Sequence, residues 1–296
     1  AVIGPTADDV TTLLANYNGT PDRYATILRG ITEGFDGRVV YARGSEITFG
    51  GAPGTDPDLP EYRPHTLREA IIAVREADAV VLCLGLNPKM EGEGGEPGAE
   101  GDKVTIELPD VQKRLLAAVT SAACGKPIVC VHVSGSCMAL GEVDRTCDAV
   151  LQCFYPGAEG GQDLADILAG KTAPTGKLPV TFYGGDYEIP DFTDYSLKNR
   201  TYRYVEQGVL YPFGYGLTYG RAEVISAAYD SESKKVSYEI VNHSDRAVEE
   251  TVQVYKKNRT SKWEVRNTVL CGFAKVCLAP GESRQGEIQL DEYAFT

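Results

Sequence analysis

The residues best suited to chemistry are carboxylates concentrated in one short segment, residues 90–103, with the sequence MEGEGGEPGAEGDK. Four glutamates and one aspartate stand there among glycines: Glu91, Glu93, Glu96, Glu100 and Asp102. The apolar run 79–86 before them predicts a buried strand. Loops that leave the carboxyl ends of strands in open α/β sheets commonly carry ligand-binding and catalytic residues. A carboxyl group on such a loop could act as a general acid, whereas the segment taken alone is more typical of a solvated acidic loop.

The composition indicates a globular protein with an acidic surface. The chain has 296 residues, of which 43% are hydrophobic and 24% are charged, and its formal net charge is −13. That length suffices for one large domain or two ordinary ones. The negative charge argues against nucleic acid or an anionic membrane as the main partner, because phosphate groups are bound by clustered Lys and Arg. No apolar run reaches the length of about 18 residues that a membrane-spanning helix needs, so no membrane partner is expected.

Cysteine and histidine do not occur in a metal-binding pattern. The eight cysteines include no CxxC pair, and His65, His132 and His243 are far apart. We therefore expect no metal and no cofactor. Several cysteines lie in apolar runs, where a free thiol behaves as a small hydrophobe, and this usage favours a cytoplasmic, reducing compartment. The chain opens on a strand-like segment with neither a methionine nor a basic region, which predicts no signal peptide here and suggests a processed or partial chain.

The elements that must position the acidic segment alternate along residues 1–200. Strand-like apolar runs are followed by segments in which apolar residues recur every three or four positions. The predicted strands are 1–3, 37–42, 79–86, 127–133 and 149–154, and the predicted helices begin near residues 26, 66, 108 and 162. For the second helix, Thr66 with Glu69 three residues later predicts a capping box. Continuous apolar strands between amphipathic helices predict an α/β fold, a mostly parallel sheet sandwiched by helices.

The pattern changes twice in the second half of the chain. Residues 171–219 are rich in proline, glycine and tyrosine, which is typical of irregular chain that wraps other elements or carries function. From residue 221 onward the pattern is all-β, with alternating runs at 235–241, 250–255, 269–276 and 283–290. These four or five strands fit a truncated fibronectin type III-like sandwich, for which about seven are usual. We therefore predict an α/β sandwich domain over 1–200, a linker over 201–220 that wraps this domain, and a β-sandwich domain over 221–296.

A series of motifs, in order along the chain, resembles the C-terminal part of glycoside hydrolase family 3. They are AVIGP at 1–5, the acidic segment 90–103 followed by Leu108-Pro109 and Gln112, YPGAEGG at 155–161, PTGKLPVT at 174–181, LYPFGYGLTY at 210–219 and LAPGE at 278–282. Together they cover nearly the whole chain. The resemblance implies the α/β sandwich domain of that family followed by part of its fibronectin type III-like domain.

The same resemblance implies a retaining β-glycosidase of the β-glucosidase or β-xylosidase type, which hydrolyses terminal non-reducing β-linked sugars. Such enzymes use two carboxyl groups about 5 Å apart, one as the nucleophile and one as the general acid and base. In this family the nucleophile is an aspartate on a preceding (β/α)₈ barrel, which this chain does not contain. The expected partners are a β-linked oligosaccharide or glycoside and the missing barrel domain, in cis or as a separate chain. The alternative is a non-catalytic carbohydrate-binding or scaffolding fragment with the same fold.

Three glutamates of the acidic segment are candidates for the acid/base: Glu93 first, Glu100 second and Glu91 third. The family pattern E-x-E-x-x-D-R implies that the acid is its second glutamate, which corresponds to Glu93. Here the spacer before Gly101-Asp102 is longer, and Lys103 stands in place of the usual arginine. Glu100, which is closer to that Gly-Asp pair, therefore stays open as the alternative.

Other conspicuous residues are expected to be structural. His132, at a strand end, is interpreted as a core or rim histidine, and Glu159 as a partner of an arginine or as a helix cap. Cys137 and Cys147 have no neighbouring base in the sequence that would support a thiol nucleophile. The aromatic residues of 202–219 are interpreted as interdomain packing, with a platform for stacking sugars as the alternative.

Overall fold

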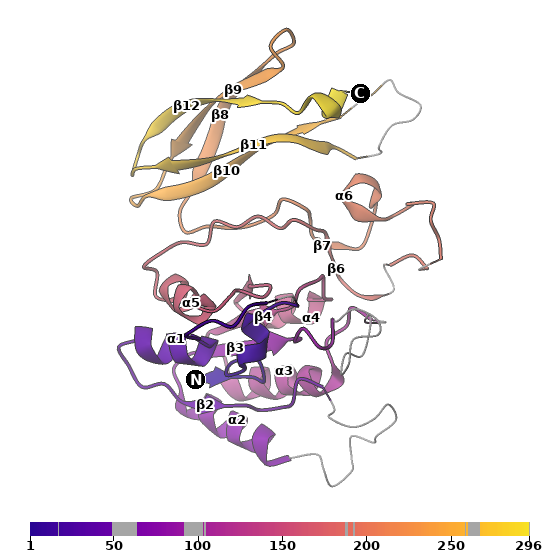
Figure 1. Cartoon of the computed structure of the whole chain (residues 1–296). Helices are drawn as coiled ribbons and strands as arrows, with labels where there is room; N and C mark the ends of the chain where they lie inside the picture. The colour runs from indigo at the N-terminus through magenta and orange to yellow at the C-terminus, as the bar shows by residue number, and fades with distance from the viewer. Residues whose placement is uncertain are drawn as a thin grey trace. The chain divides into compact units, whose positions relative to one another are not determined.

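The chain folds into two compact units (Figure 1). The structure, a computed structural model, describes all residues except 17, 49–63, 92–102, 104, 187, 188, 192, 258, 260–266 and 296, and gives only the backbone of 64, 65, 294 and 295. One unit consists of Ala1–Ala169 and Tyr183–Asp186, and the other of Gly170–Phe182 and Tyr187–Thr296. The domain boundaries placed at residues 200 and 220 from the sequence stay a prediction.

A five-stranded parallel sheet forms the centre of the first unit, which confirms the predicted α/β fold. Its strands are β1 (Val2–Ile3), β2 (Tyr41–Ala42), β3 (Val80–Gly85), β4 (Ile128–Val133) and β5 (Ala149–Gln152), in the order β2-β1-β3-β4-β5. Every pair is parallel, so the carboxyl ends of the strands lie at one edge of the sheet. The acidic segment follows β3 in the sequence, and Glu91 at its start contacts residues that follow β4 and β5.

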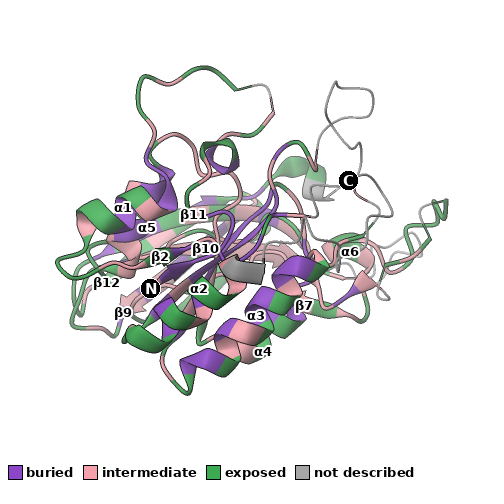
Figure 2. Cartoon of the chain, turned by 90° about the horizontal axis from the view of Figure 1, so that it is seen from below, coloured by how far each residue is buried: buried purple, intermediate pink, exposed green. Residues whose placement is uncertain are grey.

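Helices cover both faces of this sheet (Figure 1). α1 (Ile27–Gly34) packs with α5 (Gly160–Leu168) on one face, and α2 (Pro64–Glu76) packs with α3 (Asp110–Ala123) on the other. Cys83 and Val131 pack with Ile27 on the first face, while Leu82 and Leu84 point to the opposite face because side chains alternate along a strand. Figure 2 shows the buried strands between helices that are exposed on their outer sides. Two shorter elements, η1 (Val10–Leu13) and α4 (Gly141–Thr146), complete the unit.

All four predicted helices are present, as α1, α2, α3 and α5, but the cap predicted for α2 is wrong. Thr26 Oγ1 accepts a hydrogen bond from Arg29 N at 3.2 Å and caps α1, and Pro109 directly precedes α3. The capping box predicted at Thr66 is wrong, because α2 begins at Pro64. The hydroxyl of Thr66 instead donates to the carbonyl oxygen of Gly44 at 3.3 Å and ties α2 to the chain before it.

The glycines of the YPGAEGG motif allow α1 and α5 to touch through their backbones. A Cβ atom on Gly30 of α1 would lie 1.9 Å from the carbonyl oxygen of Gly161. A Cβ atom on Gly161 would lie 2.0 Å from the carbonyl oxygen of Thr26, so neither position has room for a side chain. Gly157, with a φ of +88°, instead serves the turn, because its backbone conformation is one that other residues rarely adopt.

The second unit contains the predicted antiparallel strands. β8 (Ala222–Asp230), β9 (Lys235–Asn242) and β12 (Ser283–Gln289) form one sheet in the order β12-β9-β8, and β10 (Val248–Lys256) pairs with β11 (Val269–Leu278). Tyr238, Ile240, Val252 and Leu278 belong to one core. β8 was not predicted because it is exposed along nearly its whole length and so lacks the alternation of a half-buried strand. The short elements of this unit are α6 (Thr201–Tyr204), β7 (Val209–Tyr211) and η3 (Glu292–Phe295), and β6 (Phe182–Tyr183) lies where the chain passes from this unit to the first.

Candidate active site

The structure describes the two ends of the acidic segment. Glu93 and Glu100, the first and second candidates for the acid/base, lie outside the described residues. Glu91, the third candidate, is described at one end, and Lys103 is described at the other. The geometry of the site is therefore that of these two ends and of the strand termini around them.

Two consecutive turns bring the chain from the end of β3 to Glu91. Lys89 N donates to Asn87 Oδ1 at 3.1 Å, and Met90 N donates to Asn87 O at 3.0 Å. Glu91 N then donates to Pro88 O at 3.3 Å. An asparagine side chain that bonds the backbone two residues later is a common way to begin such a turn. Asn87 therefore directs Glu91 back towards the edge of the sheet.

The carboxylate of Glu91 is surrounded by four hydrogen-bond donors. Oε2 accepts from Gly135 N at 2.6 Å and from the hydroxyl of Tyr155, and Oε1 accepts from the hydroxyl of Ser136. Lys103 Nζ lies 3.5 Å from Oε1. The side chain of Glu91 is only 9% exposed. An ionised carboxylate offers about four acceptor positions, and three of them are taken by hydrogen bonds while the ion pair with Lys103 lies beside Oε1.

The donors come from the carboxyl ends of the neighbouring strands, as the parallel sheet requires. Gly135 and Ser136 follow β4, and Tyr155 follows β5, so three adjacent strands converge on one carboxylate. Gly135 is needed for this approach, because a Cβ atom there would lie 2.8 Å from the ring of Tyr155 and 3.3 Å from Glu91 Oε2. The sheet edge is therefore shaped to receive Glu91.

The surroundings of Glu91 favour its ionised form. Burial would raise the pKa of this carboxyl, but the hydrogen bonds from Ser136, Tyr155 and Gly135 and the charge of Lys103 outweigh it and hold the pKa below its ordinary value. Burial lowers the pKa of the Lys103 ammonium, and the charge of Glu91 opposes that change. A carboxyl group that donates a proton near neutral pH needs a raised pKa, so the environment of Glu91 is the opposite of a general acid's.

The chain that returns from the acidic segment is also anchored. Lys103 Nζ donates to the carbonyl oxygen of Cys137 at 2.7 Å, and Ala139 N donates to Ile106 O at 2.7 Å. Ile106 N donates to Asp186 Oδ1 at 2.7 Å, and the hydroxyl of Thr105 donates to the other oxygen of the same carboxylate. Lys103 and Ile106 therefore lie along the segment that follows β4, ahead of α3.

Gln112 is a residue whose role the sequence did not reveal, although it stands in one of the motifs. Its Nε2 donates to Gly85 O at 2.7 Å and to Ile47 O at 2.8 Å, and its Oε1 accepts from Gly85 N at 2.8 Å. Gly85, with a φ of +132°, is the last residue of β3. The amide of Gln112 therefore replaces the ladder bonds that the chain gives up where it leaves the sheet towards the acidic segment.

The structural interpretations of single polar residues agree with the structure. His132 is buried, its Nδ1 lies 2.6 Å from Gln152 Oε1, and burial lowers its pKa to about 4, so it is neutral at neutral pH. Glu159 pairs with Arg23 at 3.2 Å on the surface. Burial raises the pKa of the Cys137 thiol, which disfavours the thiolate that a nucleophile needs.

The described residues show neither a metal-binding cluster nor a membrane-spanning helix. They contain no group of three or more His, Cys, Asp or Glu side chains that could hold a metal ion. Among them there is also no helix long and apolar enough to cross a membrane.

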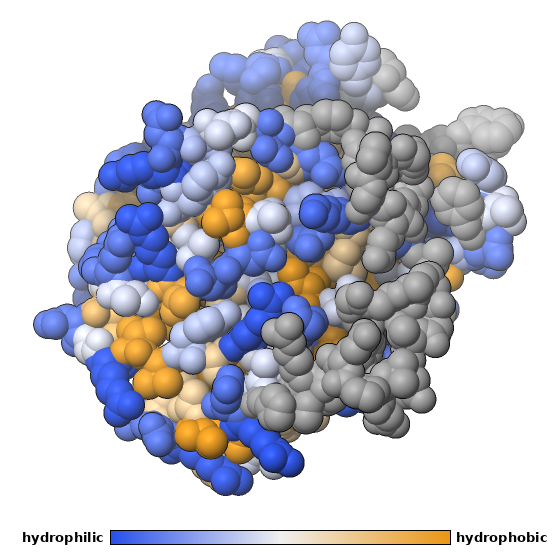
Figure 3. Space-filling model, turned by 60° about the horizontal axis from the view of Figure 1, so that its bottom comes forward, coloured by the Kyte–Doolittle hydropathy of each residue, from blue (hydrophilic) through white to orange (hydrophobic). Residues whose placement is uncertain are grey.

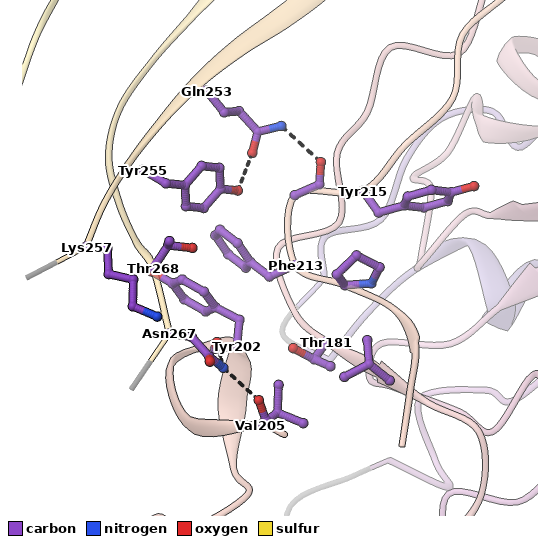
Figure 4. Close-up of a pocket in the computed structure, with 13 residues that line it drawn as sticks. Thr181, Tyr202, Val205, Phe213, Tyr215, Gln253, Tyr255, Lys257, Asn267 and Thr268 are labelled. Atoms are coloured by element: carbon purple, nitrogen blue, oxygen red, sulfur yellow. Dashed lines mark hydrogen bonds between the residues drawn. The ribbon is translucent and has the colours of Figure 1, made fainter. Parts of the chain in front are cut away.

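The second unit contains a pocket of about 570 Å³ lined by aromatic residues (Figure 4). The rings of Tyr202 and Phe213 stack on each other with 4.1 Å between their centroids, and Phe213 meets the ring of Tyr255 edge-on at 6.5 Å. The hydroxyl of Tyr255 donates to Gln253 Oε1 at 2.6 Å. Because these rings contact one another, one pair stacked and one edge-on, the contacts are typical of packing within the unit. The proposed packing between domains and the sugar platform both stay predictions.

Apolar side chains also reach the surface of the first unit. Figure 3 shows them on the face that it brings forward, separated by hydrophilic residues. Among the described residues of this unit, Phe35 and Ile72 are the most exposed large examples. Scattered apolar residues are ordinary on protein surfaces and do not by themselves mark a binding face.

Two family models match the chain. Residues 1–219 match the glycosyl hydrolase family 3 C-terminal domain, and residues 250–296 match the fibronectin type III-like domain. The first match covers the whole α/β unit and the irregular segment after it, so the chain belongs to glycoside hydrolase family 3, as the motifs suggested.

Individual relatives are longer than this chain. A xylan 1,4-β-xylosidase of Xylanibacter ruminicola is 42% identical over 231 residues, which are 75% of this chain and 26% of that protein. A periplasmic β-glucosidase of Salmonella typhimurium is 30% identical over 324 aligned residues, covering 98% of this chain and 41% of that protein. Among solved structures, the family 3 β-glucosidase of Bifidobacterium adolescentis has a TM-score of 0.83 at 28% identity, over 99% of this chain and 43% of its own.

Proposed function

We propose that this chain is the part of a retaining β-glycosidase that supplies the general acid/base, in an enzyme of the β-xylosidase or β-glucosidase type. Family membership and the names of the relatives support this reaction class. The chain spans 26% of one relative and 41% of another, which supports a (β/α)₈ barrel elsewhere, in cis or on a separate chain, as the source of the nucleophile. The substrate would be a β-linked oligosaccharide or glycoside.

The observation that carries the proposal is the position of the acidic segment. Both of its ends are held at the carboxyl edge of the parallel sheet, where α/β proteins place ligands. Extended chain spans at most about 7 Å over the two residues from Glu91 to Glu93, and at most about 11 Å over the three residues from Glu100 to Lys103. Either glutamate can therefore be presented near this edge.

Glu93 is our first choice for the acid/base and Glu100 the second. The acid protonates the leaving oxygen of the glycoside as the nucleophile attacks the anomeric carbon, and the resulting carboxylate then deprotonates the water that releases the sugar. Glu91 is the least suited of the three, because the four donors around it and its lowered pKa favour a carboxylate that keeps no proton to give.

The test uses the complete enzyme that contains this chain together with its barrel. Replacing the acid/base by alanine should slow the hydrolysis of aryl β-glycosides with poor leaving groups about 1,000-fold, since proton donation contributes about 10²–10⁴ to the rate. Activated aryl β-glycosides should still form the glycosyl-enzyme. Azide should restore the turnover of activated substrates, because it attacks the glycosyl-enzyme without a base. Glu93→Ala and Glu100→Ala are compared with Glu96→Ala as the matched control. If neither Glu93→Ala nor Glu100→Ala shows this pattern, the proposal fails.

We also infer that the protein works in a reducing compartment, in agreement with the cytoplasmic location expected from the sequence. All eight cysteines are free, and several of them are buried. Free buried thiols are typical of proteins that fold where disulfides do not form. Fractionation of the producing cells would decide this, and recovery of the protein from the periplasm or the medium would refute it.

A further inference from the structure

The two residues that flank the undescribed part of the acidic segment contact each other. Glu91 and Lys103 lie 3.5 Å apart, and their side chains are 9% and 21% exposed. Ion pairs on the surface contribute little, because water screens them, whereas a shielded pair is strongly destabilised when one partner is removed. The contact therefore joins the residues on either side of 92–102. Water screens their charges only partly, so the loss of either charge should be costly.

Each partner of this pair is itself fixed to the sheet. Glu91 is held by the backbone of Gly135 and by the hydroxyls of Ser136 and Tyr155, and Lys103 is held by the carbonyl oxygen of Cys137. The residues at 135–137 thus receive both ends of the segment side by side. A segment with both ends fixed has fewer conformations available than one with free ends, so any group it carries is found more often in one place.

We propose that Glu91 and Lys103 are positioning residues, whose ion pair fixes the base of the acidic segment so that its proton donor is presented reproducibly to the substrate. This inference rests on the proposed function, because it assigns these residues to the support of that function's acid/base. Glu91 touches neither substrate nor reacting atoms in this role, and it stays ionised throughout the reaction. Lys103 compensates the charge that Glu91 brings into the shielded site.

The first test separates positioning from proton transfer in the complete enzyme. Glu91→Gln preserves the shape of the side chain but removes its charge and turns an NH₂ group towards donors. We expect kcat/KM to fall about 10- to 100-fold for good and poor leaving groups alike, as misplacement of a catalytic group does, and azide should not restore it. A loss confined to poor leaving groups and rescued by azide would identify Glu91 as the acid/base and overturn the inference.

A matched control and a second readout keep the outcome decisive. Glu33→Gln removes a glutamate that pairs with Arg29 at 2.8 Å on the surface, where its side chain is 54% exposed, and should change kcat/KM less than twofold. Limited proteolysis of the 296-residue chain tests the segment without any activity: cleavage within 92–102 should be at least fivefold faster in Glu91→Gln than in the unaltered chain or Glu33→Gln.

The two readouts distinguish failure of the inference from failure of the proposed function. Equal cleavage rates in Glu91→Gln and the unaltered chain, with circular dichroism unchanged, would overturn the positioning role whatever the enzyme does. Faster cleavage with no catalytic role for Glu93 or Glu100 would refute the proposed function while the ion pair still fixes the segment.

Discussion

Among the described residues, each unit contains one ion pair that is largely shielded from water, and the two pairs differ in what they connect. In the α/β unit Lys103 lies 3.5 Å from Glu91, and in the other unit Lys177 lies 2.7 Å from Glu250, with side chains 16% and 21% exposed. Every other ion pair among the described residues includes a side chain that is 35% exposed or more. Shielding alone therefore does not separate a structural pair from a functional one.

The surroundings of the two pairs do separate them. Lys177 also donates to the carbonyl oxygen of Gly216 at 2.6 Å, and Glu250 also accepts from Thr251 N at 2.7 Å. That pair joins the PTGKLPVT motif to β10 and to the irregular 210–219 segment, where regular secondary structure gives little support. The pair of Glu91 and Lys103 instead joins the two ends of one acidic segment at the edge of a sheet. The pair of Lys177 and Glu250 thus stabilises the fold. The pair of Glu91 and Lys103 is placed where it can position a catalytic group.

The largest difference is expected when one charge of each pair is removed. Glu91→Leu should cost about 4 kcal/mol of unfolding free energy, because it leaves Lys103 buried without a counter-charge and Ser136 and Tyr155 without an acceptor. Glu250→Leu should cost about 2 kcal/mol, because it leaves only Lys177 and one backbone group. Urea unfolding with a constant m-value measures both. A larger loss for Glu250→Leu would reverse the comparison.

Acid should destabilise the α/β unit before the β-sandwich unit. Burial depresses the pKa of His132 from 6.5 to about 4, so its proton is bound in the unfolded chain at a higher pH than in the folded one. Stability is then full above pH 6.5 and falls by up to about 3 kcal/mol as the pH drops to 4. The lowered pKa of Glu91 contributes stability above its ordinary value of 4.5, which is lost as the pH falls further.

Hydrogen exchange measured by mass spectrometry between pH 7 and pH 4 would follow each unit separately, once the rates are corrected for intrinsic exchange. Protection of β3 and β4 should fall before that of β9 and β10. In Glu91→Gln, the protection of β3 and β4 should fall less steeply below pH 4.5. The loss of protection between pH 6.5 and 4.5 should be unchanged. Equal acid sensitivity in both units would contradict the role of these two buried groups.

Activity should respond to one lysine and not to the other. Lys103→Met should lower kcat/KM of the complete enzyme about 30-fold, because misplacement of a catalytic group by a fraction of an ångström has effects of this order. Lys177→Met should change it less than threefold at temperatures where the protein stays folded, since its contacts lie in the other unit. Assays at 15 °C with the folded fraction checked by circular dichroism separate activity from stability. Equal losses in both variants would show that the pairs serve the fold alone.

The fold was largely predictable because its signals are local. The buried strands are continuous apolar runs, and the helices show apolar residues at every third or fourth position, so each is visible within a few residues of sequence. α4 and β8 escaped prediction for a related reason. α4 has only the six residues Gly141–Thr146, and β8 is exposed on both faces, so neither repeats a periodic pattern.

The site was less predictable because its contacts are long-range. Glu91 meets Ser136 and Tyr155 across 45 and 64 residues of sequence, and nothing near Glu91 indicates either contact. Its low rank among the candidates came from the family pattern, whereas its burial among four donors comes from the parallel order of β3, β4 and β5. Gln112 and Gly135 show the same limit: both were visible as residues, but their roles depend on where the sheet ends.

The smallest effect, and the finest test of the comparison, concerns the chemistry of the cation. Lys103 stands where the family motif usually has arginine, and a guanidinium is longer, planar and able to donate two parallel hydrogen bonds to one carboxylate. Lys103→Arg should therefore keep the ion pair with Glu91 and change kcat/KM less than threefold, although the contact of Nζ with the Cys137 carbonyl has to be rebuilt. Lys177→Arg should cost more stability than activity, because Nζ there fits between Glu250 and Gly216 O at 2.7 and 2.6 Å. If Lys103→Arg were as damaging as Lys103→Met, the charge of Lys103 would matter less than its fit against Cys137, and the pair would be a packing contact like that of Lys177.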